Sequence, residues 1–203
     1  MSIMDGKVCI VTGGAGSVGF ASGKLLLEEG AKIMLVGRTA NKLSVAAAEL
    51  APFGDRVATC AADVAEVEDT KRYIAETVAR WGKVDVLFSH AGLSGVLQPI
   101  TDYPDDMFDS VMAANVRGSF LACKYCLPAM NDGGSIVITS SIMGVRADPG
   151  CCAYATSKHA LIGLARVVAK EAAPRNIRVN VCAPGPICNE FQTRIEGQLT
   201  EIL

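Results

Sequence analysis

The amino-acid sequence predicts an α/β fold in which a doubly wound, mainly parallel β-sheet lies between two layers of helices. Three observations favour this three-layer fold. Short apolar runs and helical patterns alternate from one end of the chain to the other. The runs are continuously apolar, as in strands that helices cover on both faces. Glycine and polar residues follow the runs, as they do at the ligand-binding edge of such a sheet.

Strands and helices are expected in strict alternation. The strands are expected near residues 7–12, 31–37, 56–61, 84–90, 134–140 and 177–183. The helices are expected near residues 17–29, 40–51, 67–81, 105–130 and 153–173. This order predicts right-handed crossovers between parallel strands. Because no linker, repeat or low-complexity segment interrupts the pattern, residues 1–203 are expected to form a single domain.

The composition argues against several classes of function. Half of the 203 residues are hydrophobic, the mean hydropathy is +0.32, and the formal net charge is −2 with no basic tract. Nucleic-acid binding is therefore not expected, because it needs clustered lysine and arginine. No stretch reaches the roughly 20 apolar residues of a membrane span, and the N-terminus lacks a signal-peptide pattern. We expect a cytoplasmic protein with no membrane partner.

Cys123 and Cys126 form a C-x-x-C pair among the eight cysteines. Such a pair occurs in redox sites and as half of a zinc site. Here it lies inside the apolar helical pattern of residues 120–127, and no second C-x-x-C or histidine pair follows. We therefore expect reduced and mostly buried thiols, and no metal site.

Residues suited to binding follow five of the expected strands. Because the carboxyl ends of parallel strands share one edge of the sheet, these residues are expected to form one site. They are Gly13–Gly19 after the first strand, Asp63 after the third, Ser89–Gly92 after the fourth, Ser140 and Ser141 after the fifth, and Pro184 and Gly185 after the sixth.

The segment Thr12–Gly19 predicts a phosphate-binding loop. Gly14, Gly16 and Gly19 satisfy the pattern G-x-G-x-x-G between a strand and a helix. Glycine lets the backbone approach a pyrophosphate, and the helix N-terminus offers free N–H groups and a positive dipole end. The alternative is an ordinary strand–helix turn. In this context we favour a dinucleotide bound on a Rossmann-type domain.

The end of the second strand indicates which dinucleotide is bound. An acidic residue there would hold a ribose 2′-hydroxyl, whereas an arginine accommodates a 2′-phosphate. The strand ends in residues 35–39, where Gly37 leaves space and Arg38 offers a planar donor fork without a carboxylate nearby. This pattern favours NADP(H) over NAD(H), which stays possible. The alternative is that Arg38 is a solvated surface residue.

Tyr154 and Lys158 predict the acid–base chemistry. Four residues apart on a helix, they lie on one face, one turn from each other. Tyrosine, with a pKa near 10 in water, is a poor catalyst at neutral pH, but a nearby ammonium and the helix N-terminus both favour its phenolate. Ser141, at the end of the fifth strand, is placed to hydrogen-bond a substrate oxygen. A lone Y-x-x-x-K pattern is a common coincidence.

Several ordered motifs together give the chain a resemblance to the short-chain dehydrogenases/reductases along essentially its whole length. The matching segments are Thr12–Gly19, Asp63-Val64, His90–Gly92, Asn115–Gly118, Ser140–Gly144, Tyr154–Lys158 and Pro184-Gly185. The step of 13 residues from Ser141 to Tyr154 fits the family's catalytic spacing. The fold, the activity and the roles of the residues given next are what this resemblance implies.

The resemblance assigns four catalytic residues. Tyr154 is the general acid/base, Lys158 lowers the pKa of the tyrosine and binds the nicotinamide ribose, Ser141 orients the substrate oxygen, and Asn115 holds a water that links Lys158 to solvent. The implied cofactor-binding residues are Gly13, Gly16, Ser17, Val18, Gly19, Arg38, Asp63, Val64, His90, Ala91, Gly92, Tyr154, Lys158, Pro184 and Gly185. Simpler roles stay open: Ser141 caps a turn, Asn115 is an interior helix residue, and Asp63 caps the following helix.

The chain departs from the family pattern at four places. Ser17 stands where glycine is usual, His90 replaces the asparagine before Ala-Gly, and Asn189 stands where a threonine commonly binds the carboxamide. We interpret His90 as lining the cofactor, and His159 as pointing away from the catalytic face. The fourth departure is the end of the chain at Leu203, within a segment that resembles the start of a substrate-covering region.

That last departure predicts an exposed edge on the sixth strand, and little activity unless another chain covers the site. The leading function is an NAD(P)(H)-dependent oxidoreductase that interconverts a secondary alcohol and a ketone of small or medium size. One alternative is a truncated dinucleotide-binding or assembly protein with little turnover. Another is an isomerase or dehydratase of the related extended family, against which the short length argues. The resemblance also implies a homodimer or homotetramer, formed through the long helices near 105–130 and 153–173.

Overall fold

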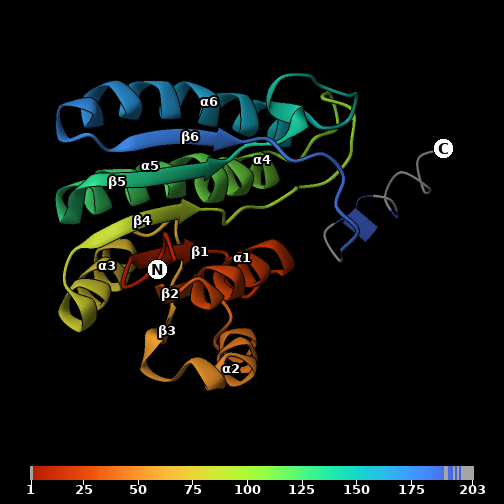
Figure 1. Cartoon of the computed structure of the whole chain (residues 1–203). Helices are drawn as coiled ribbons and strands as arrows, with labels where there is room; N and C mark the ends of the chain where they lie inside the picture. The colour runs from red at the N-terminus through yellow and green to blue at the C-terminus, as the bar shows by residue number, and fades with distance from the viewer. Residues whose placement is uncertain (1, 190–191, 194, 196, 198–203) are drawn as a thin grey trace.

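A computed structural model of the chain describes residues 2–189, 192–193, 195 and 197. Its strands are β1 (Val8–Thr12), β2 (Lys32–Gly37), β3 (Val57–Ala61), β4 (Val84–Ser89), β5 (Met130–Thr139) and β6 (Arg178–Cys182). They form one sheet in the order β3-β2-β1-β4-β5-β6, and every neighbouring pair is parallel (Figure 1). The expected doubly wound α/β fold is confirmed, with its topological switch point between β1 and β4.

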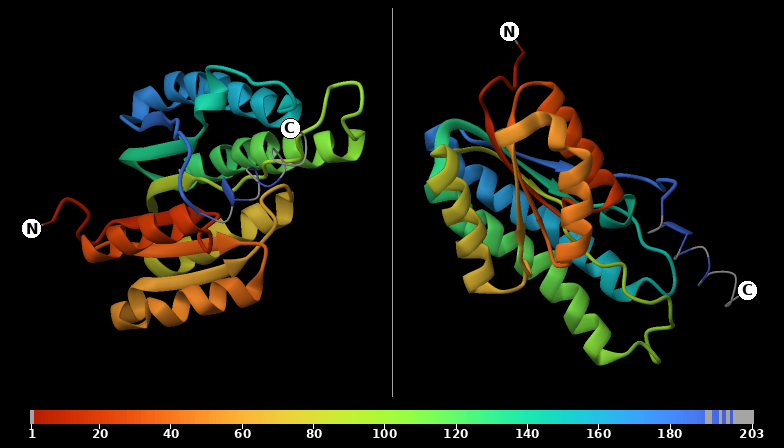
Figure 2. Two further views of the ribbon diagram at one scale, coloured as in Figure 1. Left: turned by 90° about the vertical axis from the view of Figure 1, so that its right-hand side faces the viewer. Right: turned by 90° about the horizontal axis from the view of Figure 1, so that it is seen from below.

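Helices flank this sheet on both faces (Figure 2). They are α1 (Ser17–Glu28), α2 (Ala40–Glu49), α3 (Val67–Trp81), α4 (Asp105–Met112), α5 (Gly118–Cys126) and α6 (Cys152–Ala172). One core cluster joins the sheet to α1 and α2, and a second joins the sheet to α3, α5 and α6. The two clusters are the apolar cores of a three-layer molecule.

Successive residues of the central strands serve opposite cores. In β1, Cys9 and Val11 belong to the core under α1 and α2, whereas Ile10 belongs to the core under α3, α5 and α6. All five residues of β1 are buried, Cys9, Ile10 and Val11 completely. Since side chains alternate across a strand, burial on both faces requires an uninterrupted apolar run.

The long helix expected over residues 105–130 is instead two α-helices joined by a π-helical turn and followed by a 3₁₀ turn. A π-helical turn at Ala113–Arg117 separates α4 from α5, and a 3₁₀ turn at Leu127–Ala129 follows α5. Pro128 lies in that 3₁₀ turn, and β5 already begins at Met130, which pairs with Val84. The apolar pattern continued across this boundary, but proline lacks an N–H and ends the helix. In the same way, a 3₁₀ turn that contains Pro52 follows α2.

The edge strand β6 alternates between exposed and half-buried positions. Val179 and Val181 pack against the core that includes α6, whereas Arg178, Asn180 and Cys182 are exposed. Within the described residues β6 pairs only with β5 and lies at one end of the sheet. Across that same part of the chain, no helix combines the length and apolar character needed to cross a membrane.

Candidate active site

The carboxyl ends of β1, β2, β3 and β4 surround a small cavity of about 130 Å³. It is lined by Gly13, Gly37, Arg38, Ala62, Asp63, Val64, Ala91, Gly92, Leu93 and Ala114. Six of the residues predicted to bind a cofactor are among them: Gly13, Arg38, Asp63, Val64, Ala91 and Gly92. The sheet therefore brings these residues, from four separate strand ends, to one place.

Two glycines of the phosphate loop, Gly13 and Gly19, have no room for a side chain. Gly13 has a φ of +71°, and a Cβ there would lie 3.1 Å from the backbone of Ala91. A Cβ on Gly19 would collide with the carbonyl oxygen of Gly13. The helix α1 begins at Ser17, and its N-cap residue Gly16 offers no side-chain cap. The backbone N–H groups of the first turn are thus presented to a ligand, and the loop fits a pyrophosphate.

Arg38 and Asp63 border the cavity from β2 and β3. Arg38 is exposed and follows Gly37, as the predicted contact with a 2′-phosphate requires. The carboxylate of Asp63 accepts a hydrogen bond of 2.9 Å from the backbone N–H of Ala65. The N-cap of α3 is Glu66, so the interpretation of Asp63 as the cap of the following helix is wrong. Asp63 instead closes a local turn at the rim of the cavity.

Ser141, Tyr154 and Lys158 meet where β5 ends and α6 begins. Ser141 caps the 3₁₀ turn Ile142–Gly144, because its Oγ accepts the backbone N–H of Met143 at 3.1 Å. It also hydrogen-bonds the Tyr154 hydroxyl. The Nζ of Lys158 lies 5.5 Å from the centroid of the Tyr154 ring. Ser141 therefore caps a turn and contacts Tyr154 as well.

Burial dominates the electrostatics of this group. It raises the pKa of Tyr154 above its ordinary value, and the hydrogen bond from Ser141 opposes that rise. Burial also lowers the pKa of Lys158 to about 8. The Lys158 side chain is 4% exposed, and its Nζ donates a 2.8 Å hydrogen bond to the carbonyl oxygen of Thr139. The lowering of the Tyr154 pKa by Lys158 that the sequence predicts stays a prediction.

Asn115 is fully buried in the π-helical turn between α4 and α5. Its Oδ1 accepts the backbone N–H of Leu93 at 2.7 Å, and its Nδ2 donates to the carbonyl of Leu93 at 3.0 Å and to Ser157 Oγ at 2.9 Å. Ser157 in turn donates to the carbonyl of Tyr154. Asn115 thus connects the loop after β4 to the first turns of α6. Both N–H donors of Nδ2 are already hydrogen-bonded to protein atoms. The water relay implied by the family resemblance stays a prediction.

The two histidines have different surroundings. The ring of His90 contacts Thr139 Oγ1 through Nδ1 at 3.1 Å. The pKa of His90 is lowered to about 4, mainly by burial and to a smaller extent by the charge of Lys158. A cofactor contact of His90 stays a prediction, since the small cavity is lined by its neighbour Ala91. His159 Nδ1 lies 2.9 Å from the carbonyl oxygen of Ala155, one turn earlier in α6, as expected for a residue off the catalytic face.

Three further residues hydrogen-bond parts of the site to one another, although sequence reasoning gave none of them a role of its own. They are Thr12, Thr139 and Ser157. Thr12 Oγ1 accepts the backbone N–H groups of His90 and Ala91 at 3.0 and 3.1 Å. The only feature of the sequence that indicates this role of Thr12 is its place as a hydroxyl residue at the end of an apolar run. Ser140 is used structurally, since its Oγ donates to the carbonyl of Lys158 at 2.8 Å.

The segment after β6 returns toward the phosphate loop. The carbonyl of Pro184 accepts the N–H of Ile142 at 2.9 Å, and Gly185 follows it. Asn189 Nδ2 donates to Ser17 Oγ at 3.0 Å, so two departures from the family pattern contact each other. Most of the expected covering segment, residues 190–203, lies outside the described residues.

The C-x-x-C pair lies in the core. Cys123 is 3% exposed and Cys126 is fully buried on α5, and burial raises the pKa of both thiols. Cys9 and Cys60 are buried as well, while Cys182 and Cys188 are exposed. Among the described residues, no group of three or more histidine, cysteine, aspartate or glutamate side chains is arranged to hold a metal.

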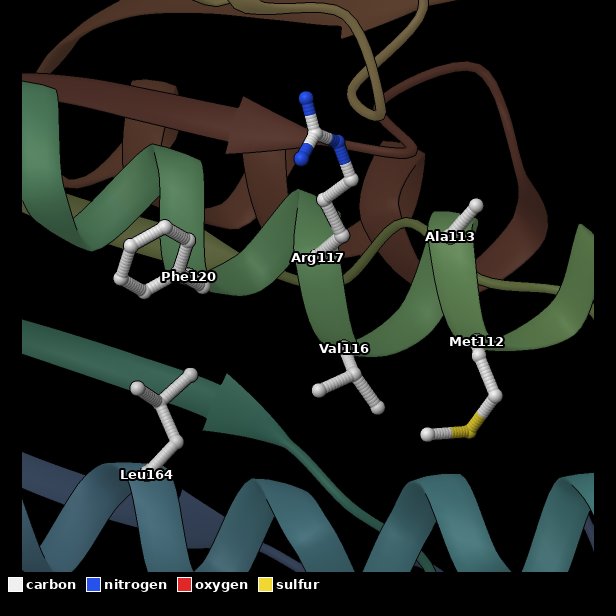
Figure 3. Close-up of a pocket in the computed structure, with 6 residues that line it drawn as sticks. All are labelled: Met112, Ala113, Val116, Arg117, Phe120 and Leu164. Carbon is white, nitrogen blue, oxygen red and sulfur yellow. The ribbon is translucent and has the colours of Figure 1, made fainter. Parts of the chain in front are cut away.

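A larger apolar hollow of about 610 Å³ lies away from this site, between α6 and the helical segments around the π-helical turn (Figure 3). Its lining residues are Met112, Ala113, Val116, Arg117, Phe120 and Leu164. Met112, Val116 and Leu164 point into the space between the helices. None of the predicted site residues lines it, so its greater size does not make it the active site.

A family model described as short chain dehydrogenase matches residues 7–199. Among curated proteins, dehydrogenase/reductase SDR family member 4 from Homo sapiens is 36% identical over 187 residues, which span 91% of this chain and 67% of that protein. The range matched by the family model, residues 7–199, spans the positions of all four residues predicted to be catalytic.

Solved structures give the same similarity in three dimensions. The crystal structure of levodione reductase has a TM-score of 0.93 and 32% identity, and the match covers 97% of this chain and 78% of that chain. The structure of NAD⁺-bound xylitol dehydrogenase has a TM-score of 0.87 and 38% identity, over 90% of this chain and 71% of that one.

Proposed function

The chain belongs to the short-chain dehydrogenase family of NAD(P)-dependent oxidoreductases, and from that premise we propose that it interconverts a secondary alcohol and a ketone. The observation that carries the proposal is the meeting of Ser141, Tyr154 and Lys158 at the end of β5 and the start of α6. On the same edge of the sheet lies the small cavity of about 130 Å³ at the ends of β1–β4, lined by six residues predicted to bind the cofactor.

In this proposal, Tyr154 exchanges a proton with the substrate oxygen. A bound nicotinamide supplies or accepts the hydride at the substrate carbon. Because burial raises the pKa of Tyr154, its hydroxyl stays protonated at neutral pH and is ready to donate to a carbonyl oxygen. Ser141 orients that oxygen through its hydroxyl. The ammonium of Lys158 favours the phenolate that remains after the proton has moved.

We assign the dinucleotide as NADP(H) in preference to NAD(H). Arg38 is exposed at the rim of the small cavity, beside Gly37, and residues 35–39 contain no carboxylate that would bind a 2′-hydroxyl. A guanidinium pairs with phosphate in a planar, bidentate geometry. Five further residues keep their predicted cofactor-binding role because of where they lie: Gly16, Ser17 and Val18 around the phosphate loop, and Pro184 and Gly185 after β6.

We further propose that the protein is a homodimer or homotetramer, with a second copy of the chain covering the apolar hollow. Phe120, at its edge, is 44% exposed, and the other lining residues are mostly apolar. Solvent-exposed apolar surface of this kind favours association. The two helical segments concerned are those that the family resemblance identifies with subunit contacts.

The test of the reaction is a panel of small and medium-sized ketones, each supplied with NADPH and the purified chain. Oxidation of NADPH that depends on the ketone, and formation of the corresponding alcohol by mass spectrometry, are expected for at least one member. The chain without ketone and the ketone without chain are the controls. Bound cofactor without turnover on any member would favour the dinucleotide-binding alternative.

A further inference from the structure

His90 is a partly buried imidazole to which the proposed reaction assigns no step. Its backbone N–H is held by Thr12 Oγ1 at 3.0 Å, at the end of β4. Its ring lies 5.3 Å from the ring of Phe88, and a Cβ on Gly13 would approach its Cδ2 to 3.3 Å. The ring therefore packs between Phe88 of β4 and Gly13 of the phosphate loop.

The orientation of the ring directs Nδ1 at β5. The distance from Nδ1 to Thr139 Oγ1 is 3.1 Å, within hydrogen-bond range. The same residue, Thr139, accepts the Lys158 ammonium on its backbone carbonyl at 2.8 Å. One residue of β5 thus connects the His90 ring to the proposed active-site lysine.

We propose that His90 is a positioning residue, whose hydrogen bond to the Thr139 hydroxyl fixes the end of β5 so that the Thr139 carbonyl holds the ammonium of Lys158. The inference rests on the proposed function only for what Lys158 does during turnover. The contacts themselves join His90 to Lys158 in the chain without any ligand.

The charges around the pair fit this role. The lowered pKa of His90 keeps its ring neutral at neutral pH, so that it adds no positive charge beside Lys158. The titratable side chain that faces Lys158 from its own helix is Tyr154, at 5.5 Å from ring centroid to Nζ. Since a carbonyl acceptor favours the charged form of lysine, any loosening of Thr139 lowers the pKa of Lys158 further.

Two variants separate hydrogen bonding by His90 from packing by its ring. In His90→Asn, the amide atoms stand as many bonds from the backbone as Nδ1 does, so the bond to Thr139 is kept while ring packing is lost. In His90→Leu, apolar bulk is kept and the bond is lost. Thr139→Val and Thr139→Ser make the same comparison from the other partner. His159→Asn is the matched control, since His159 contacts Ala155 and not Thr139.

The experiment measures the pKa of Lys158 by NMR, following the Cε resonance in protein labelled with ¹³C-lysine, without cofactor or substrate. The resonance is assigned by its loss in Lys158→Arg. His90→Leu and Thr139→Val are expected to lower the Lys158 pKa by about one unit. His90→Asn, Thr139→Ser and His159→Asn are expected to leave it at its wild-type value.

An unchanged Lys158 pKa in folded His90→Leu would overturn the proposal, and so would an equal fall in His90→Asn and His90→Leu. If His90→Leu does not fold, the pair Thr139→Val and Thr139→Ser decides by the same criterion. The NMR titration does not depend on turnover, so its result can be interpreted even if the proposed reaction proves wrong. Conversely, an unchanged titration would leave the reaction proposal intact.

Discussion

The Nζ of Lys158 lies 5.5 Å from the centroid of the Tyr154 ring, one turn earlier on the same helix. The two side chains face the end of β5, where Ser141 hydrogen-bonds the tyrosine hydroxyl. This arrangement makes Tyr154 the group that exchanges the substrate proton in our proposal. It also separates the proton-transfer hydroxyl of Tyr154 from the phosphate loop, which belongs to another part of the predicted cofactor site.

The variant Tyr154→Phe tests this separation. We expect turnover to fall by about 10²–10⁴-fold, the usual contribution of a positioned acid–base group. Affinity for the dinucleotide is expected to stay close to that of the wild type, because the ring and its packing are retained. Steady-state kinetics with an active ketone, together with cofactor titration, measure both. Equal turnover in the variant and the wild type would rule out the acid–base assignment.

The variant Arg38→Ala tests the choice of cofactor. Loss of a charge-assisted contact to the 2′-phosphate is expected to cost about 1.5–3 kcal/mol, or roughly 10–100-fold in NADPH affinity. NADH affinity is expected to change little. Lys42→Ala is the matched control, an exposed cation on α2 that does not line the small cavity. If Arg38→Ala weakened both dinucleotides equally, or neither, the NADP(H) assignment would be wrong.

Burial of Lys158 predicts a pH-dependent stability. Its pKa in the folded chain is about 8, below the ordinary 10.5, so between these pH values the unfolded chain binds more protons. The contribution of Lys158 to the free energy of unfolding therefore rises with pH across this window. The burial of protonated Lys158 lowers the free energy of unfolding, and this destabilisation is fully present below pH 8. By linkage its size is on the order of 3 kcal/mol.

Lys158→Met removes the titrating group. The difference in the free energy of unfolding between this variant and the wild type is expected to shift by about 3 kcal/mol between pH 8 and 10.5. Urea denaturation at several pH values measures it, and subtraction cancels the groups that titrate in both proteins. A difference that does not change with pH would show that Lys158 keeps its ordinary pKa.

The proposed subunit contact predicts a change in mass. Phe120→Asp places a charge in the apolar hollow next to Leu164 and Val116, where a second copy is expected to pack. Light scattering after size-exclusion chromatography should then show a smaller assembly than the wild type, with the helical content retained. Ile3→Asp is the control, since Ile3 is 88% exposed at the other end of the chain. A wild-type monomer would contradict the proposal outright.

The alternation of strands and helices was readable from the sequence because burial on both faces leaves continuous apolar runs, as in β1 and β2. The boundary near Pro128 between the helical region and β5 could not be predicted from the sequence, because the apolar pattern runs through the end of α5 into Met130. The π-helical turn around Asn115 was not readable either. It depends on side-chain bonds to Leu93 and Ser157, which lie far away in the sequence.

The candidate site shows the same division. Gly13, Asp63, Ala91 and Gly92 could be placed together, because strand order brings their strand ends to one edge. The shift in the pKa of Lys158 could not be predicted, because it depends on how deeply α6 buries its side chain. The contact between Ser17 and Asn189, which are 172 positions apart, also required the structure.

The central claim is that the chain binds a nicotinamide dinucleotide, and the most direct test is a titration of the folded chain with NADPH and with NADH. Nicotinamide fluorescence reports the binding, and circular dichroism verifies the fold of the same sample. We predict saturable binding of both dinucleotides, with the higher affinity for NADPH. A folded sample that binds neither dinucleotide would contradict the account.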